Sequence, residues 1–141
     1  MDENDATTAL WRGEGCQHRG MAEKHSRSVP GGRAFWWTTS LWTASARLPV
    51  IRVPIAGIRE LDEDCWFDGR APTCREVAEH ARRIAQADLR HPVILAADGR
   101  LMDGGHRIAK AWLEGRQEVD AVRFEADPEP DWVVLDSQGD R

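Results

Sequence analysis

The chain has 141 residues, of which 41% are hydrophobic and 30% are charged, and its formal net charge is −5. This length and composition suit one globular domain with one apolar core. No apolar run approaches the roughly 20 residues that cross a bilayer, and the acidic start of the chain has no apolar signal region. We therefore expect a cytoplasmic protein with no membrane span.

The charge also bears on DNA. Residues 1–34 carry five basic and five acidic groups, so residues 35–141 hold the whole net charge of −5. A domain that grips duplex DNA by itself needs a basic face, because contacts to phosphates dominate its affinity. Autonomous DNA binding is therefore not expected.

The three cysteines are Cys16, Cys65 and Cys74. Their odd number and wide spacing do not suit a disulfide framework. They also lack the paired spacing of zinc ligands, so no protein-held metal site is predicted. Free thiols are the expected state.

The two ends of the chain are expected to be irregular. Residues 1–34 lack periodic hydrophobicity and are rich in glycine, which predicts a disordered or loosely attached arm. Residues 35–135 are expected to form the domain and residues 136–141 a tail, with Asp127–Asp131 as an acidic, extended segment. Within the domain, the tryptophan-rich stretch Phe35–Trp42 is interpreted as a packing lid. Ser40 could cap a short helix over residues 41–47.

The middle of the chain has clearer signals. Val50–Ile55 is rich in β-branched residues and predicts a strand at the edge of a sheet, because it contains a proline. Ile58–Asp62 follows as an acidic turn. Thr73 and Glu76 match the capping box of a helix start, and the apolar spacing beyond them predicts a helix that ends near Ala87.

The last third of the chain predicts a hairpin, a helix and a strand. Asp98-Gly99 is typical of a two-residue hairpin turn of type I′. The helix after Gly104-Gly105 has an apolar stripe at helical spacing. The remaining predicted elements are a strand at Pro92–Ala96, a return strand from Leu101 and a last strand at Val119–Phe124. Together these elements indicate an α+β fold, with a mixed sheet that contains a hairpin and packs against two to four helices.

The stretch Asp103-Gly104-Gly105-His106-Arg107 carries the strongest chemical signal. A helix start has backbone N–H groups without intrahelical acceptors and a partial positive charge. Glycines let a ligand approach those groups, and arginine suits phosphate. The pattern therefore predicts a phosphate-binding turn. The alternative is a tight turn in which Arg107 pairs with Asp103 and His106 is a buried, hydrogen-bonded histidine.

A wider pattern resembles the ParB/sulfiredoxin superfamily over roughly residues 48–125. It comprises the capped helix, the segment "ADLRHPVIL" that contains Pro92, and the segment "DGRLMDGGHRIAKAWLEG". The resemblance implies a small domain whose turn at Asp103–Arg107, together with Pro92, holds the phosphates of ATP, ADP or CTP with Mg²⁺. Its expected partner is a nucleotide or another phosphorylated small molecule.

The departures from that pattern narrow the expected chemistry. Sulfiredoxins have a reactive cysteine where this chain has Gly105, so reduction of sulfinic acid is not expected. Partition proteins continue into DNA-reading and dimerisation domains, for which we expect no room here. A third branch phosphorylates serine with the help of a carboxylate, and Glu60 and Asp62 lie in the comparable region. The resemblance thus implies a nucleotide-dependent phosphotransferase or hydrolase with Glu60, Asp62 and His106 as candidate catalytic residues, unless Glu60 and Asp62 belong to a solvated acidic loop.

Two other functions remain open. A non-catalytic accessory module would hold a protein partner through the Phe35–Trp42 stretch and the acidic segment near the end. A ParB-type nuclease or DNA-binding protein is disfavoured by the charge.

Three residues near the predicted site each have two possible interpretations. His80 is a structural histidine or a neighbour of the site, and Trp66 and Phe67 fill the core or stack on a base. Arg107 is expected to be an exposed site residue whose loss costs roughly 0.5 kcal/mol of stability or less.

Overall fold

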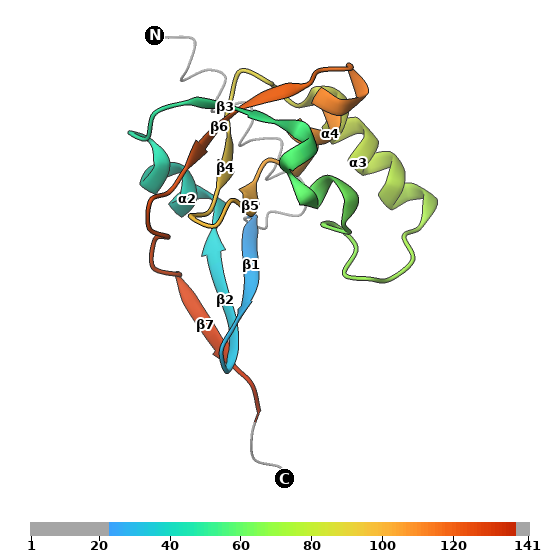
Figure 1. Cartoon of the computed structure of the whole chain (residues 1–141). Coiled ribbons are helices and arrows are strands. Elements are labelled where there is room, and N and C mark those ends of the chain that lie inside the picture. The colour runs from blue at the N-terminus through green and yellow to red at the C-terminus, as the bar shows by residue number, and fades with distance from the viewer. Residues whose placement is uncertain (1–22, 138–141) are drawn as a thin grey trace, which may run out of the picture. The chain divides into compact units, whose positions relative to one another are not determined.

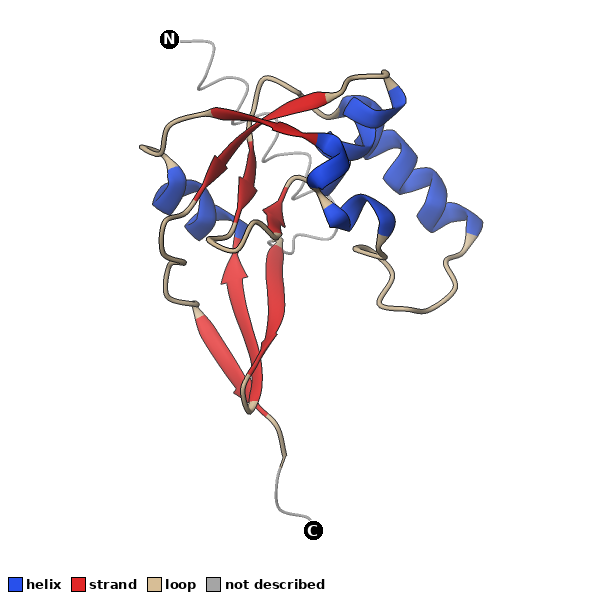
Figure 2. Ribbon diagram, in the orientation of Figure 1, coloured by secondary structure: helices blue, strands red, loops and turns tan. Residues whose placement is uncertain are grey.

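The structure is a computed structural model that describes residues 23–137. The chain divides into two compact units. Of the described residues, one unit comprises residues 23–43 together with residues 129–137, and the other is Ala44–Pro128. Within the described residues there are three α-helices and two sheets, which confirms the predicted α+β class. Figure 2 distinguishes the helices from the strands.

The first unit contains an antiparallel sheet in the order β1-β2-β7 (Figure 1). Strands β1 (Lys24–Val29) and β2 (Gly32–Trp37) form a hairpin, and β7 (Trp132–Leu135) pairs with the other edge of β2. Helix α2 (Thr38–Ser45) follows β2 directly. The Asp131 carboxylate accepts hydrogen bonds from the Trp37 backbone nitrogen and from the Ser40 hydroxyl, at 2.8 and 3.1 Å.

This sheet corrects the expectations for both ends of the chain. Residues 24–34 lie in β1 and the start of β2 rather than in a loose arm, whereas residues 1–22 fall outside the described residues. The strand predicted at Val119–Phe124 is not the last one, because β7 follows it. The polar sequence of β1 gives little hydrophobic signal, since only one face of the sheet is buried. Ser40 lies inside α2 and does not precede it, because the helix begins at Thr38.

The second unit has a mixed sheet in the order β3-β6-β4-β5, in which β4 and β6 are parallel and the other pairs are antiparallel. Its core is formed by apolar side chains of the strands, of helix α4 and of Ile55 and Ile58. Val93, Ala111 and Ala121 are fully buried. The elements of this unit, in chain order, are β3 (Ile51–Pro54), η1 (Ile55–Gly57), η2 (Arg59–Asp62), α3 (Cys74–Gln86), β4 (Val93–Leu95), β5 (Leu101–Asp103), α4 (Gly105–Leu113) and β6 (Glu118–Arg123).

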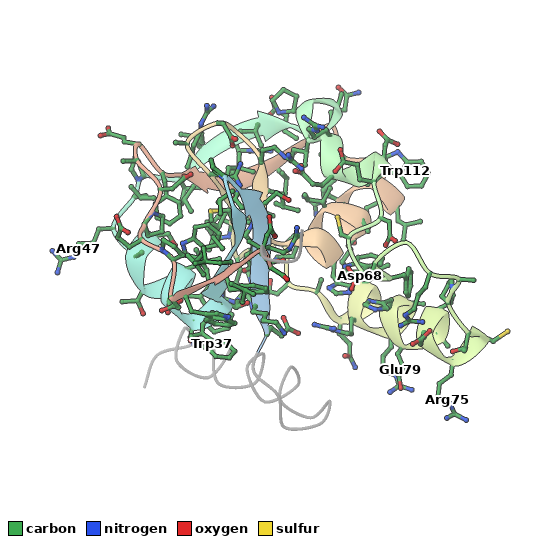
Figure 3. All side chains as sticks on the ribbon, turned by 90° about the horizontal axis from the view of Figure 1, so that it is seen from below. Trp37, Arg47, Asp68, Arg75, Glu79 and Trp112 are labelled. Carbon is green, nitrogen blue, oxygen red and sulfur yellow. The ribbon has the colours of Figure 1, made fainter. Side chains whose placement is uncertain are left out.

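Helix α3 begins as predicted. The Thr73 hydroxyl accepts from the Glu76 backbone nitrogen, and the Glu76 carboxylate accepts from the Thr73 backbone nitrogen, so the capping box is complete. Arg70 adds two hydrogen bonds to the same carboxylate, and they hold the pKa of Glu76 down, at about 2. Arg75 and Glu79, labelled in Figure 3, lie on the outward side of the helix. No helix of the described residues is both long and apolar enough to cross a membrane.

The hairpin and the helix after it each differ from expectation in one detail. The Ala96 nitrogen donates to the Arg100 oxygen and the Gly99 nitrogen to the Ala96 oxygen, so three residues form the loop. Gly99 has a φ of 89°, and Asp98 is not among the residues with positive φ. The turn is therefore a type I turn followed by a left-handed glycine, and not type I′. In α4, Trp112 is exposed, at 61%, although it belongs to the predicted apolar stripe.

Candidate functional site

The predicted phosphate turn joins strand β5 to helix α4. Asp103 ends the strand, Gly104 is the N-cap residue and Gly105 begins the helix. Gly104 has a φ of 124°, and a Cβ built on it would lie 2.6 Å from Cγ1 of Val93. Only glycine fits both the backbone angle and the packing against β4. Gly104 therefore makes room for the core and not, as predicted from the sequence, for a ligand.

Arg107 is buried, at 5% exposure, and its guanidinium is fully engaged in the fold. Nη2 pairs with Oδ2 of Asp103 at 2.8 Å, and Nη1 donates to the backbone oxygens of His91 and Pro92 at 3.1 and 2.7 Å. The arginine therefore ties the first turn of α4 to β5 and to the chain entering β4. This corrects the expectation of an exposed arginine, and it gives Pro92 the role of an acceptor for Arg107.

Three rings form a layer at the start of α4. Nδ1 of His80, on α3, lies 2.8 Å from Nε2 of His106, so the two histidines share a hydrogen bond. The indole of Trp66 stacks on both, with ring centroids 4.6 Å from His80 and 4.5 Å from His106. The Trp66 nitrogen Nε1 also lies 3.3 Å from the place of a Cβ on Gly105. Gly105 therefore gives the indole access to the helix start, and we name Trp66, His80 and His106 the ring layer.

The electrostatics of the ring layer favour a neutral His106. Burial, which is the largest cause, and the charge of the Arg83 guanidinium, which is the next, help to lower the pKa of His106 to about 3. His80 and Arg107 act on the His106 pKa in the same direction. Arg83 lies three residues after His80 on α3, so both point to the same side of that helix. The charges that act on His106 are therefore cationic, although the chain as a whole is acidic.

This pKa predicts a specific loss of stability in mild acid. The unfolded chain protonates His106 near pH 6.5, while the folded chain keeps it neutral down to about 3. The unfolded state then binds more protons in that window, so the free energy of unfolding should fall as the pH drops from about 6.5 toward 3. Urea unfolding at pH 7 and at pH 5 measures the change.

The variant His106→Gln provides the control for this prediction. The carboxyl groups of Glu76 and Asp88, whose pKa values are lowered to about 2, change the free energy of unfolding mainly below about pH 5, where the unfolded chain begins to protonate them. His91, whose pKa is lowered by burial, contributes equally to both proteins. The variant should therefore lose less stability between pH 7 and 5 than the original chain, and equal losses would contradict a neutral, buried His106.

The predicted carboxylates are placed differently from the expected catalytic arrangement. Glu60, in η2, is buried, and Oε2 pairs with Nε of Arg100 at 3.0 Å. Asp62 is exposed at the end of η2. Among the described residues, no hydrogen bond or ion pair joins either carboxylate to the His106 ring. The structure therefore gathers Asp103, Gly104, Gly105, His106, Arg107 and Pro92 at the start of α4, while Glu60 contacts Arg100.

The ring layer is only partly predictable from the sequence. The helical spacing of α3 made His80 a candidate neighbour of the site, and the structure places it there. Trp66 was expected to fill the core or stack on a base, whereas it stacks on two histidines. Neither its loop nor its spacing indicates this. The effect of Arg83 on His106 has no signal in the sequence, because it depends on how α3 packs beside the start of α4.

Comparison of the chain with protein-family models, with curated proteins and with solved structures gives no match. The resemblance to the ParB/sulfiredoxin superfamily therefore rests on the residues and motifs alone.

Proposed function

We propose that the second unit is a nucleotide-binding domain of ParB/sulfiredoxin-like type, and that the start of α4 binds phosphate of ATP, ADP or CTP. The observation that carries the proposal is the group of N–H donors and positive charge at this helix start. The first N–H groups of a helix attract anions, and the Trp66 indole nitrogen lies beside Gly105. Of the charged groups that act on His106, the Arg83 guanidinium has the largest effect, whereas Arg107 is paired with Asp103.

The predicted site residues have different roles under this proposal from those expected from the sequence. Arg107 and Asp103 hold the turn rigid through their ion pair, because both are committed to it. Arg83 replaces Arg107 as the cation that faces a phosphate. Neutral His106 can donate or accept a hydrogen bond without adding charge, since its pKa lies far below neutral pH. A rigid helix start with a neutral histidine suits binding of a polyphosphate at neutral pH.

The proposal is limited to binding. A transferase or hydrolase needs a base near the transferred group, and the Glu60 carboxylate is buried against Arg100. Mg²⁺ prefers carboxylate oxygens and water, but Glu60 and Asp103 both carry arginine partners. Asp62 belongs to no group of three or more metal-ligating side chains within the described residues. These residues do not fit a protein-held Mg²⁺ site. Any Mg²⁺ would arrive with the nucleotide's own phosphates, so binding should persist when Mg²⁺ is removed.

Titration of the ¹⁵N-labelled chain with ATP, ADP, CTP and pyrophosphate tests this proposal. The amide signals of Gly105 and His106 should shift on addition of each ligand, with or without Mg²⁺. Arg83→Ala should weaken binding roughly 10- to 100-fold, as expected for loss of a hydrogen bond to a charged group. Arg75→Ala is the matched control, since Arg75 lies exposed near the other end of α3 and its loss should leave affinity unchanged.

Three results would count against the proposal. One is the absence of amide shifts at millimolar nucleotide. Another is equal weakening by Arg83→Ala and Arg75→Ala, which would indicate a general charge effect. The last is a set of shifts confined to residues outside α3, α4 and the Trp66 loop.

A further inference from the structure

The sheet of the first unit has one buried face and one open face. In an antiparallel pair, residues directly opposite each other lie on the same face, and successive residues alternate. Ala34 and Trp36 of β2 point to the buried face, with exposures of 2% and 4%. Phe35 and Trp37 therefore belong to the opposite face, where Trp37 is 38% exposed. Phe35 pairs directly with Trp132 of β7, which places Trp132 on the same face.

Three aromatic rings form a continuous row on this open face. Trp132 stacks on Phe35 with ring centroids 4.8 Å apart and planes within 1°. Trp37 lies on the other side of Trp132, also at 4.8 Å, with its plane tilted by 49°. Because Trp132 is flanked by both neighbours, Trp37 forms one end of the row. In Figure 3 the labelled Trp37 side chain extends away from the ribbon.

Two positive charges flank the aromatic row. Lys24 of β1 lies directly opposite Trp37. Arg33 lies two residues from Phe35 on β2, and Nε and Nη1 donate to the hydroxyls of Ser26 and Ser28 at 3.0 and 3.1 Å. These hydroxyls are uncharged, so they orient the guanidinium without neutralising it. Within the described part of the chain, neither Lys24 nor Arg33 pairs with a carboxylate.

We propose that this open face, defined by Phe35, Trp37, Trp132, Lys24 and Arg33, binds single-stranded nucleic acid. Aromatic side chains on a sheet accept unpaired bases by stacking, and nearby cations follow the phosphates. The two cations favour a polyanion as the occupant, and the Asp131 carboxylate beside Trp37 is engaged by the Trp37 backbone nitrogen and the Ser40 hydroxyl. It is single-stranded because two cations are too few for a duplex, whose affinity depends on many phosphate contacts. The exposed ring of Trp37 receives a base, and Lys24 and Arg33 contact the backbone on either side.

The acidic net charge of the chain opposes a polyanion at long range, so stacking has to supply most of the affinity. A ligand held mainly by stacking and by two phosphate contacts has a shallow salt dependence. For single strands the slope of log affinity against log salt is about −0.7 per contact, so two contacts give about −1.4. A protein that bound through a general basic surface would show a much steeper slope.

The test uses the full chain and a fluorescently labelled single-stranded DNA oligonucleotide of mixed sequence, measured by anisotropy at several salt concentrations. Trp37→Ala should weaken binding roughly 5- to 150-fold, the range expected for loss of one stacked base. Trp112→Ala is the matched control, because Trp112 is an exposed tryptophan of the other unit and should not affect binding. Circular dichroism of each variant checks that it folds.

A second variant covers the case in which Trp37→Ala disturbs the sheet. Lys24→Glu keeps the aromatic row and reverses one charge, so it should weaken binding and make the salt slope shallower. The Arg83→Ala variant should bind the oligonucleotide as the original chain does, which separates this face from the start of α4.

Four outcomes would overturn the proposal. They are no binding at low salt, equal effects of Trp37→Ala and Trp112→Ala, duplex DNA binding as tightly as the single strand, and no change with Lys24→Glu. Displacement of the oligonucleotide from Trp37 by a proline-rich peptide that binds more tightly would assign the face to peptides instead.

Discussion

Replacing Arg107 with alanine should destabilise the chain by about 3–5 kcal/mol, the usual cost of removing one partner of a buried ion pair. The substitution leaves the Asp103 carboxylate, which is largely buried, without its cation. It also removes the donor to the backbone oxygens of His91 and Pro92. Urea unfolding monitored by circular dichroism measures the loss. This expectation reverses the sequence-based one, in which Arg107 was an exposed binding residue.

Arg116→Ala is the control for this substitution. Arg116 also pairs with a carboxylate, that of Glu114 at 3.0 Å, but both side chains are exposed. Exposed pairs contribute little, so the expected change is about 0.5 kcal/mol or less. Similar effects of the two alanine variants would contradict the structural role of Arg107. The double variant Arg107→Leu with Asp103→Leu removes both charges together and should recover part of the loss.

Gly104→Ala should be similarly severe, at about 3 kcal/mol or more. The added Cβ meets Cγ1 and Cβ of Val93 at 2.6 and 2.8 Å. The φ of 124° is also strained for any residue with a side chain, and the cost of strain adds to the cost of overpacking. The expected result is a large fall in the midpoint of thermal unfolding.

Gly57→Ala is the matched control for Gly104→Ala. Gly57 lies in η1 of the same unit, its φ is not positive, and a Cβ built on it meets nothing within 4 Å. Its replacement should leave the midpoint nearly unchanged or raise it slightly. If Gly104→Ala is tolerated as well as Gly57→Ala, the described packing at Gly104 is wrong.

Local signals in the sequence were enough to predict the main helices and strands of the second unit. Thr73 and Glu76 define the start of α3 because a capping box involves only four consecutive residues. The strand, hairpin and helix sequence from Pro92 to Leu113 was also predictable, because each element carries its own periodicity or turn residues. The turn type was not, since Asp98-Gly99 can serve a two-residue or a three-residue loop.

The sheet of the first unit and the buried ion pair of Arg107 could not be predicted from local sequence patterns, because both depend on contacts between distant residues. Strand β1 is mostly polar, and β7, although apolar at all four positions, is short and follows an acidic, proline-containing segment. Both strands pair with β2. The hydrogen bond from Trp37 to Asp131 joins residues 94 positions apart, a distance that no local pattern reveals. Arg107 sits one position after a histidine in a helix start, where an arginine can point to solvent or to the core. The carbonyls of His91 and Pro92 decide between the two, and their position depends on how β4 enters the sheet.

The late pairing of β7 bears on how the chain acquires its structure during synthesis. Strands β1 and β2 leave the ribosome before β7, which pairs with the other edge of β2 and follows about ninety residues later. The intervening segment, Ala44–Pro128, is continuous and holds its own core, so it can fold before β7 emerges. Until then β2 has an unpaired edge next to Phe35 and Trp37, and such edges attract other chains. Closing this long loop is also entropically costly, so the docking of β7 is expected to be the final step of folding.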